Sequence, residues 1–164
     1  MSEEAFNVLF LCTANSARSI MAESILRSVG NSKFNSFSAG SVPAGDVHPT
    51  ALGLLKRLDM PIEGLRSKSW DEFAIDNAPQ LDFVFTVCDA AAAERCPVWP
   101  GQPLSAHWGI ADPAVGSDNE IQALQRFRTA FNELERRIGI FVNLPFDALD
   151  SMRLQREIER IGRQ

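Results

Sequence analysis

The chain lacks the features that mark secreted, membrane and nucleic-acid-binding proteins. Its first residues carry neither the basic region nor the long apolar region of a signal peptide, and it has no run of roughly 18 apolar residues that could span a membrane. It also lacks an excess of positive charge, because its net charge at pH 7 is −5, which disfavours a nucleic-acid partner. We therefore expect a cytoplasmic protein that binds neither a membrane nor nucleic acid.

Cysteine is scarce, and tyrosine is missing altogether. The three cysteines, Cys12, Cys88 and Cys96, are an odd number at unequal spacing, which argues against a structural disulfide framework. This usage favours a reducing compartment in which thiols are free to react. The negative net charge also means that local donors must hold any anionic ligand, because the field of the whole protein does not attract it.

The order of apolar runs and helical patterns predicts an α/β fold. The 164 residues, 45% of them hydrophobic, fit a single domain. Short apolar runs predict buried parallel strands, and a 3.6-residue period predicts helices. The predicted strands are Asn7–Cys12, Phe34–Ala39, Leu81–Val87 and Ser105–Trp108, and the predicted helices are Ser16–Val29, Pro49–Leu58, Glu120–Phe141 and Asp147–Ile161, the last capped by Asp147.

This alternation predicts a parallel four-stranded sheet with helices on both faces and a ligand at the carboxyl ends of the strands. We expect residues 1–141 to form the main α/β domain and residues 142–164 to form a C-terminal helical extension of the same domain.

A cysteine and an arginine stand on either side of five small or polar residues directly after the first predicted strand. These residues can bend the backbone around a tetrahedral anion so that their N–H groups point inward, and the amides and dipole of the following helix start add to the same site. The residues expected to bind the oxyanion together with Arg18 are Thr13, Ala14, Asn15, Ser16 and Ala17.

Cys12 is the candidate nucleophile of this loop. The helix start and the cationic Arg18 favour the thiolate, so we expect a lowered pKa for Cys12. The planar guanidinium of Arg18 suits bidentate binding of phosphate-like oxygens, and the hydroxyl of Ser19 can donate to the sulfur. The alternative interpretation is a small core cysteine at a strand end and a solvated arginine.

Cys88 directly follows a predicted strand, so in a parallel sheet it emerges at the same edge as Cys12. Residues 89–95 favour a helix, which would hold the Cα atoms of Cys88 and Cys96 about 12 Å apart. Because a disulfide needs a Cα separation of about 4.4–6.8 Å, bonding these two cysteines requires either a looped segment or a helix that unwinds. We favour unwinding, as a redox-driven step.

Two other interpretations of these cysteines stay open. Cys88 and Cys96 can be unrelated buried thiols, or they can bind a metal ion together with His107. The close paired spacing of zinc ligands is missing, so we expect no metal. His48, which precedes Pro49, is interpreted as a helix-start residue and not as a ligand.

Asp112 is the candidate proton donor. A cysteine that attacks an oxyanion needs an acid for the departing oxygen, on a loop that reaches the anion site. Asp112 follows the fourth predicted strand and an aromatic turn, and Pro113 holds it extended. Asp89, beside Cys88, is the weaker candidate.

Cys12, Arg18-Ser19 and Asp112-Pro113 together resemble the low-molecular-weight protein tyrosine phosphatase superfamily. The segments around Cys88 and Cys96, with the His107-Trp108-Gly109 turn, are similar to its thiol-dependent arsenate reductase branch. The resemblance covers approximately residues 7 to 141 and implies a low-molecular-weight phosphatase-like fold.

The resemblance also implies a route from arsenate to arsenite. Cys12 attacks arsenate, Asp112 protonates the leaving hydroxide, and Arg18 with the loop amides holds the oxyanion, for which phosphate competes. Cys88 then attacks Cys12 and arsenite departs, after which Cys96 takes over the disulfide. An external thiol reductant, thioredoxin or glutaredoxin with glutathione, reduces it, and no cofactor is tightly bound.

Two departures from the family pattern disfavour a phosphatase. Ala17 stands where these phosphatases usually carry a second cysteine, and no tyrosine follows Asp112-Pro113. Hydrolysis of phosphomonoesters through a phosphocysteine intermediate is therefore the alternative function, and a non-catalytic oxyanion-binding module is a third.

Two further departures concern the reductase branch. The interval between Cys88 and Cys96 is one residue longer than in its thioredoxin-coupled members. The family's potassium site would draw on Asn15, Glu23 and Ser38, but its expected aspartate is replaced near Ser69, which argues against potassium dependence.

Overall fold

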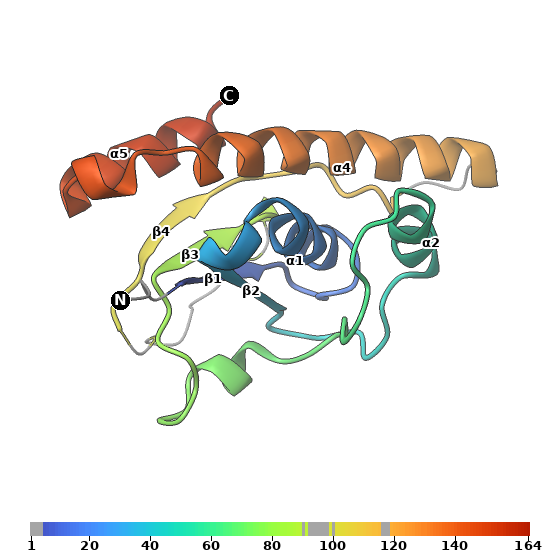
Figure 1. Cartoon of the computed structure of the whole chain (residues 1–164). Coiled ribbons are helices and arrows are strands. Elements are labelled where there is room, and N and C mark those ends of the chain that lie inside the picture. Colours follow the sequence, from blue (N-terminus) through green and yellow to red (C-terminus); the bar gives the residue numbers. More distant parts are fainter. Residues whose placement is uncertain (1–4, 90, 92–98, 100, 116–118) are drawn as a thin grey trace.

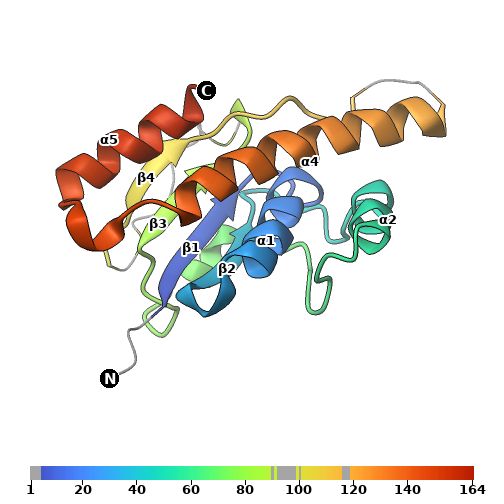
Figure 2. The same ribbon diagram turned by 45° about the horizontal axis from the view of Figure 1, so that its top comes forward.

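The sheet has four parallel strands in the order β2-β1-β3-β4 (Figures 1 and 2). The strands are β1 (Phe6–Leu11), β2 (Phe34–Ala39), β3 (Phe83–Thr86) and β4 (Leu104–His107). The computed structural model describes residues 5–89, 91, 99, 101–115 and 119–164. This architecture confirms the predicted α/β fold class, and β2 has the predicted bounds.

Helical segments cover the two faces of the sheet unequally. The α-helices of the described residues are α1 (Arg18–Val29), α2 (Pro49–Arg57), α4 (Glu120–Val142) and α5 (Ser151–Gly162). These four contribute buried side chains to one apolar cluster on one face. On the other face the described cover is the 3₁₀ helix η2 (Trp70–Phe73), with Phe73 buried against it (Figure 1). Two more 3₁₀ helices are η1 (Asn31–Lys33) and η3 (Phe146–Ala148).

The alternating side chains of β1 supply both cores. Val8 and Phe10 belong to the cluster on the α1 side, whereas Leu9 and Leu11 belong to the smaller cluster on the η2 side, and all four are fully buried. This pattern explains why a strand buried on both faces reads as one continuous apolar run.

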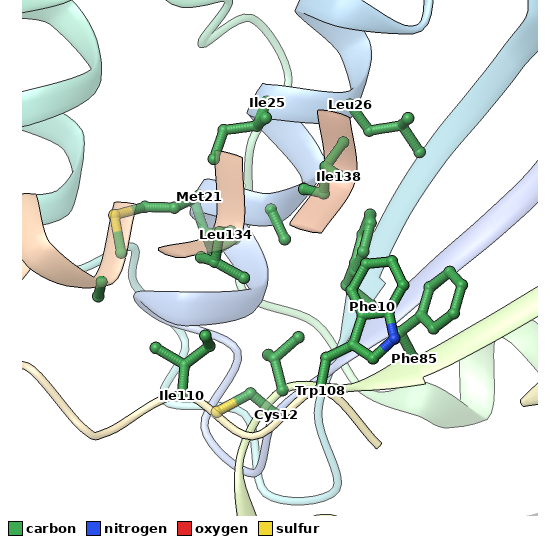
Figure 3. Close-up of a cluster of buried hydrophobic side chains, with 14 of the residues drawn as sticks. Phe10, Cys12, Met21, Ile25, Leu26, Phe85, Trp108, Ile110, Leu134 and Ile138 are labelled. Atoms are coloured by element: carbon green, nitrogen blue, oxygen red, sulfur yellow. The ribbon is translucent and has the colours of Figure 1, made fainter. Parts of the chain in front are cut away.

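Trp108 packs the end of the sheet against the helices. Its ring stacks on Phe85 with centroids 3.8 Å apart, and its indole N–H donates to the carbonyl of Ile158 in α5 at 2.9 Å. Figure 3 shows these aromatic rings beside α1 and α4, with the Cys12 sulfur at the edge of the same cluster near Ile110. The apolar core therefore extends up to the cysteine.

The helix α5 begins later than the sequence predicts. Asp147 lies in η3, and the N-cap of α5 is Asp150, which accepts from the backbone N–H of Arg153 at 2.9 Å. The predicted cap was therefore wrong, because η3 comes between α4 and α5 and residues 149 and 150 are not yet helical. The other predicted bounds lie within two residues of those observed. None of the described helices is long and apolar enough to cross a membrane.

Gly162 lets α5 approach the sheet closely, and Gly139 in α4 provides a comparison. A Cβ atom at Gly162 would overlap the carbonyl oxygen of His107, whereas a Cβ atom at Gly139, inside α4, would have no atom within 4 Å. We expect Gly162→Ala to lower the free energy of unfolding by about 1–3 kcal/mol through overpacking. Gly139→Ala should raise it by about 0.5–1 kcal/mol through helix propensity. Urea unfolding measures both changes, and a neutral Gly162→Ala would contradict this packing.

Candidate active site

The carboxyl ends of β1 and β3 bring two cysteines together. These strands are parallel neighbours, with Leu11 opposite Thr86, and Cys12 follows β1 directly while Cys88 follows β3 by two residues. Strand order reverses between β1 and β3, since β2 lies on one side of β1 and β3 on the other. Such a switch point is where open α/β sheets bind ligands.

The thiols of Cys12 and Cys88 are hydrogen-bonded to each other and are 5% and 2% exposed. Both cysteines are free thiols. The backbone N–H groups of Thr13 and Ala91 each donate to Cys88 Sγ at 3.4 Å, and the Thr13 hydroxyl lies 3.8 Å from the same sulfur. Hydrogen-bond donors therefore converge on Cys88.

The acidic thiol of this pair is Cys88, and the expectation of a lowered pKa for Cys12 was wrong. The hydrogen bond from Cys12, helped by the N–H groups of Ala91 and Thr13, lowers the pKa of Cys88 to about 5 against the effect of burial. The hydrogen bond to Cys88 and burial raise the pKa of Cys12, although Arg18 acts in the opposite direction. The sequence placed Cys88 at the same edge of the sheet as Cys12, but it could not reveal the hydrogen bond between the two sulfurs.

The loop between β1 and α1 has its carbonyl groups bonded to the chain that follows β2. The carbonyl oxygens of Thr13, Ala14 and Ser16 accept from the N–H groups of Val42, Ala44 and His48 at 2.9, 2.9 and 2.8 Å. The helix α1 begins at Arg18, later than the predicted Ser16, and its N-cap Ala17 makes no side-chain cap bond. An uncapped helix start leaves its first amides to an anion.

Asn15 fixes the corner of this loop. It is fully buried and has a positive φ of 47°, a conformation that a non-glycine residue adopts only at a cost. Its side-chain amide offsets that cost: Nδ2 donates to Ser19 Oγ at 2.8 Å, and Oδ1 accepts from the backbone N–H of Lys68 at 2.9 Å. The Ser19 hydroxyl is therefore itself held in place at the start of α1.

Arg18 and Asp112 meet at the side of the loop. Arg18 Nη1 donates to the carbonyl of Ile110 at 2.8 Å, and Nη2 lies 3.7 Å from Asp112 Oδ2. The Arg18 side chain is 14% exposed and that of Asp112 is 42% exposed. Asp112 Oδ1 also accepts from the N–H of Ala114 at 2.9 Å. The structure therefore places a half-exposed carboxyl group beside the predicted anion-binding arginine.

The other candidates have different partners. Asp89, the weaker candidate acid, has its Oδ1 2.7 Å from His107 Nε2, and His107 Nδ1 lies 2.8 Å from the hydroxyl of Thr86. Both ring nitrogens of His107 are thus engaged, and the described residues contain no group of three metal-ligating side chains. His48 caps α2 by accepting from the N–H of Thr50 at 3.1 Å, as predicted.

Cys96 lies outside the described residues. Of the helix predicted over residues 89–95, the structure describes residues 89 and 91, and both are helical.

Two residues that support the site were missed by the sequence analysis. A Cβ atom at Gly40 would overlap the carbonyl oxygen of Thr13, so β2 can end this close to the loop only with glycine. Lys68 is 8% exposed and donates to Asn15 through its backbone. In sequence it stands in a polar stretch, which gives no signal of burial.

The residues implied for a potassium site do not fit that ion. Ser38 Oγ donates to Glu23 Oε1 at 2.6 Å, and Lys68 Nζ lies 3.8 Å from the same oxygen. Glu23 Oε2 accepts from Arg27 Nη2 at 2.8 Å, and Asn15 Oδ1 accepts from the backbone N–H of Lys68. Two cationic side chains already surround one carboxylate, so a further cation would be repelled.

The chain is similar to known proteins in sequence. A sequence model described as "Low molecular weight phosphotyrosine protein phosphatase" matches residues 7–157. An arsenate reductase of Bacillus subtilis is 32% identical over 134 residues, which are 82% of this chain and 93% of that protein.

Solved structures give the same neighbours. An arsenate reductase in the phosphate binding state has a TM-score of 0.66 at 28% identity over 84% of this chain and 96% of its own. A thioredoxin-dependent arsenate reductase of Corynebacterium glutamicum has a TM-score of 0.58 at 26% identity, and the match covers 85% of this chain and 64% of that one.

The lowered pKa of Cys88 predicts how the reduced protein titrates. At neutral pH the ultraviolet thiolate absorbance should correspond to one thiolate, which is lost as the pH falls through about 5, because the folded-state pKa of Cys88 lies below its ordinary value. Cys88→Ser should remove this transition. If Cys12→Ser removes it and Cys88→Ser leaves it unchanged, Cys12 is the acidic thiol instead.

Proposed function

Because the chain belongs to the low molecular weight phosphotyrosine protein phosphatase family, we propose that it reduces arsenate to arsenite through Cys12, Cys88 and Cys96. The observation that carries this proposal is that the parallel pairing of β1 with β3 brings the buried Cys12 and Cys88 together, with the N–H of Thr13, the residue after Cys12, donating to Cys88 Sγ at 3.4 Å. Hydrolysis through a phosphocysteine needs water as the second nucleophile, whereas reduction needs a second thiol in contact with the first.

The first step is attack of Cys12 Sγ on the arsenic of arsenate. A sulfur–arsenic bond forms and an arsenic–oxygen bond breaks, and Asp112 gives the departing oxygen a proton so that it leaves as water. The proton of Cys12 passes to the Cys88 sulfur with which it is hydrogen-bonded. Arg18 and the N–H groups of residues 14–18 hold the remaining oxygens, while Ser19 donates to the attacking sulfur.

The second step reduces arsenic and oxidises the two thiols. Cys88 gives up that proton to an oxygen of the arsenic adduct, while the N–H groups of Thr13 and Ala91 stabilise its thiolate. The thiolate attacks Cys12 Sγ and forms the Cys12–Cys88 disulfide. The sulfur–arsenic bond breaks, its electron pair stays on arsenic, and arsenite leaves. Arsenic is thereby reduced by two electrons while two thiols become one disulfide.

The third step regenerates the nucleophile. Cys96 attacks Cys88, which frees Cys12 and leaves a Cys88–Cys96 disulfide that an external dithiol reduces. We propose a thioredoxin-like reductant, which the thioredoxin-dependent reductase of Corynebacterium glutamicum supports, and glutaredoxin with glutathione is the alternative. The location we propose for these reactions is the cytoplasm, whose reducing poise keeps the thiols free.

The second candidate function is hydrolysis of phosphomonoesters. The contact between Arg18 and Asp112 favours it, because a nucleophile, an anion-binding arginine and an acid are sufficient for that reaction. The comparison of both activities in one set of variants separates the candidates.

Cys88→Ser is the variant that separates the two functions. Arsenate turnover with a thioredoxin system should fall by about 10³-fold or more, because the sulfur–arsenic adduct cannot be reduced. Hydrolysis of para-nitrophenyl phosphate should persist. Cys12→Ser, the matched control, should lose both activities. Retained arsenate turnover in Cys88→Ser would exclude the thiol relay.

Asp112→Asn tests the proton donor. The first step of either reaction should slow by about 10²–10⁴-fold, the usual contribution of a general acid. Asp89→Asn is the control, since Asp89 is paired with His107, and it should react at nearly the wild-type rate. Single-turnover mixing with arsenate measures the step, and equal losses in both variants would count against Asp112 as the acid.

A further inference from the structure

Lys68 is a buried cationic residue that contacts the anion-binding loop. It is 8% exposed, and the side chain it faces, Glu23 in α1, is 5% exposed. A charge this deeply buried is stabilised only when it is paired and hydrogen-bonded. Neither residue takes part in the reaction proposed above, so the pair needs a separate explanation.

The Lys68 ammonium has two partners. Its Nζ lies 3.8 Å from Glu23 Oε1 and donates to the carbonyl of Arg66 at 3.0 Å. Ser38, at the end of β2, donates to the same Glu23 oxygen at 2.6 Å. Burial lowers the pKa of Lys68, and Glu23 opposes that shift by favouring the charged form. The pair therefore joins α1, β2 and the chain around Lys68.

The backbone of Lys68 and its neighbour hold the loop. The Lys68 N–H donates to Asn15 Oδ1 at 2.9 Å, and its carbonyl accepts from the N–H of Gly40 at 2.9 Å. The hydroxyl of Ser67 donates to the carbonyl of Ala14 at 3.1 Å. The contact with Glu23 fixes the position of Lys68, and the backbone of Lys68 in turn fixes Asn15 at the corner of the loop.

We propose that Lys68 is a built-in cation that positions the anion-binding loop and makes the protein independent of any free monovalent cation. Its ammonium takes the place beside Glu23 and Ser38 that a potassium ion would otherwise fill. Lys68 is thus a positioning residue, which acts on the oxyanion through Asn15 without touching it. The inference rests on the proposed function only in that the loop binds a tetrahedral anion.

The first test needs no variant. The melting temperature of the wild-type protein and its Kd for inorganic phosphate should be the same in sodium chloride and potassium chloride at equal ionic strength. A wild-type protein that melts higher or binds phosphate more tightly in potassium than in sodium would overturn the proposal.

The second test removes the ammonium in two ways. Lys68→Met keeps the volume and the backbone bond to Asn15, whereas Lys68→Ala also opens space beside Glu23. Both should melt lower and bind phosphate roughly tenfold more weakly, the effect typical of lost supporting contacts around a ligand site. Potassium or methylammonium should restore phosphate binding in Lys68→Ala and not in Lys68→Met. Lys56→Met, at an exposed lysine of α2, is the control and should match the wild type.

The outcomes separate this inference from the proposed function. If the wild type binds phosphate and both Lys68 variants bind it equally well, Lys68 is not a positioning residue, and the reductase proposal is untouched. If the wild type binds no phosphate or arsenate, the proposed function fails. Should the single variants not fold, Lys68→Met combined with Glu23→Gln is measured; the proposal predicts that this charge-free pair regains stability, and a pair that stays unfolded overturns it.

Discussion

The structure depends on the contact between two thiols at the switch point of the sheet. Neighbouring parallel strands end side by side, so Cys12 after β1 and Cys88 after β3 meet although 76 positions separate them in the chain. Both cysteines are buried in the apolar cluster that contains Trp108, and the polar neighbours of Cys88 are backbone N–H groups and the Thr13 hydroxyl. The pairing of β1 with β3 therefore has a chemical consequence, because it brings two free thiols together at one edge of the sheet.

A chain of net charge −5 must attract an anion through local groups alone. Three parts of the fold meet this requirement together. N–H groups of the chain after β2 bind the carbonyl oxygens of the loop, so that these oxygens are already hydrogen-bonded. The uncapped start of α1 adds free amides, and the carbonyl of Ile110 accepts a hydrogen bond that orients Arg18. Backbone groups form the first two and orient the Arg18 side chain in the third, and backbone dipoles do not depend on the overall charge of the protein. The site can therefore be selective for tetrahedral anions on an acidic surface.

The sequence predicted what depends on local pattern and missed what depends on tertiary pairing. Buried strands, the helix periods and the loop after Cys12 follow from composition within a short window, which is why those bounds lie close to the observed ones. The acidity of Cys88 and the burial of Lys68 could not be predicted in this way, because the partner of each is remote in sequence. The cap of α5 was misplaced for a different reason: Asp147 and Asp150 are both good caps, and only the packing of η3 decides between them.

The distribution of charge in the thiol pair suits an anionic substrate. Two thiolates in contact would repel each other and any incoming oxyanion, and a charge on Cys12 would stand directly in the path of the substrate. Because the donors converge on Cys88, they favour a negative charge on the sulfur that reacts second, and the Cys12 proton is favoured until Arg18 and the loop amides hold an oxyanion. The Cys12 thiolate then forms when the positive groups of the loop are already engaged with substrate.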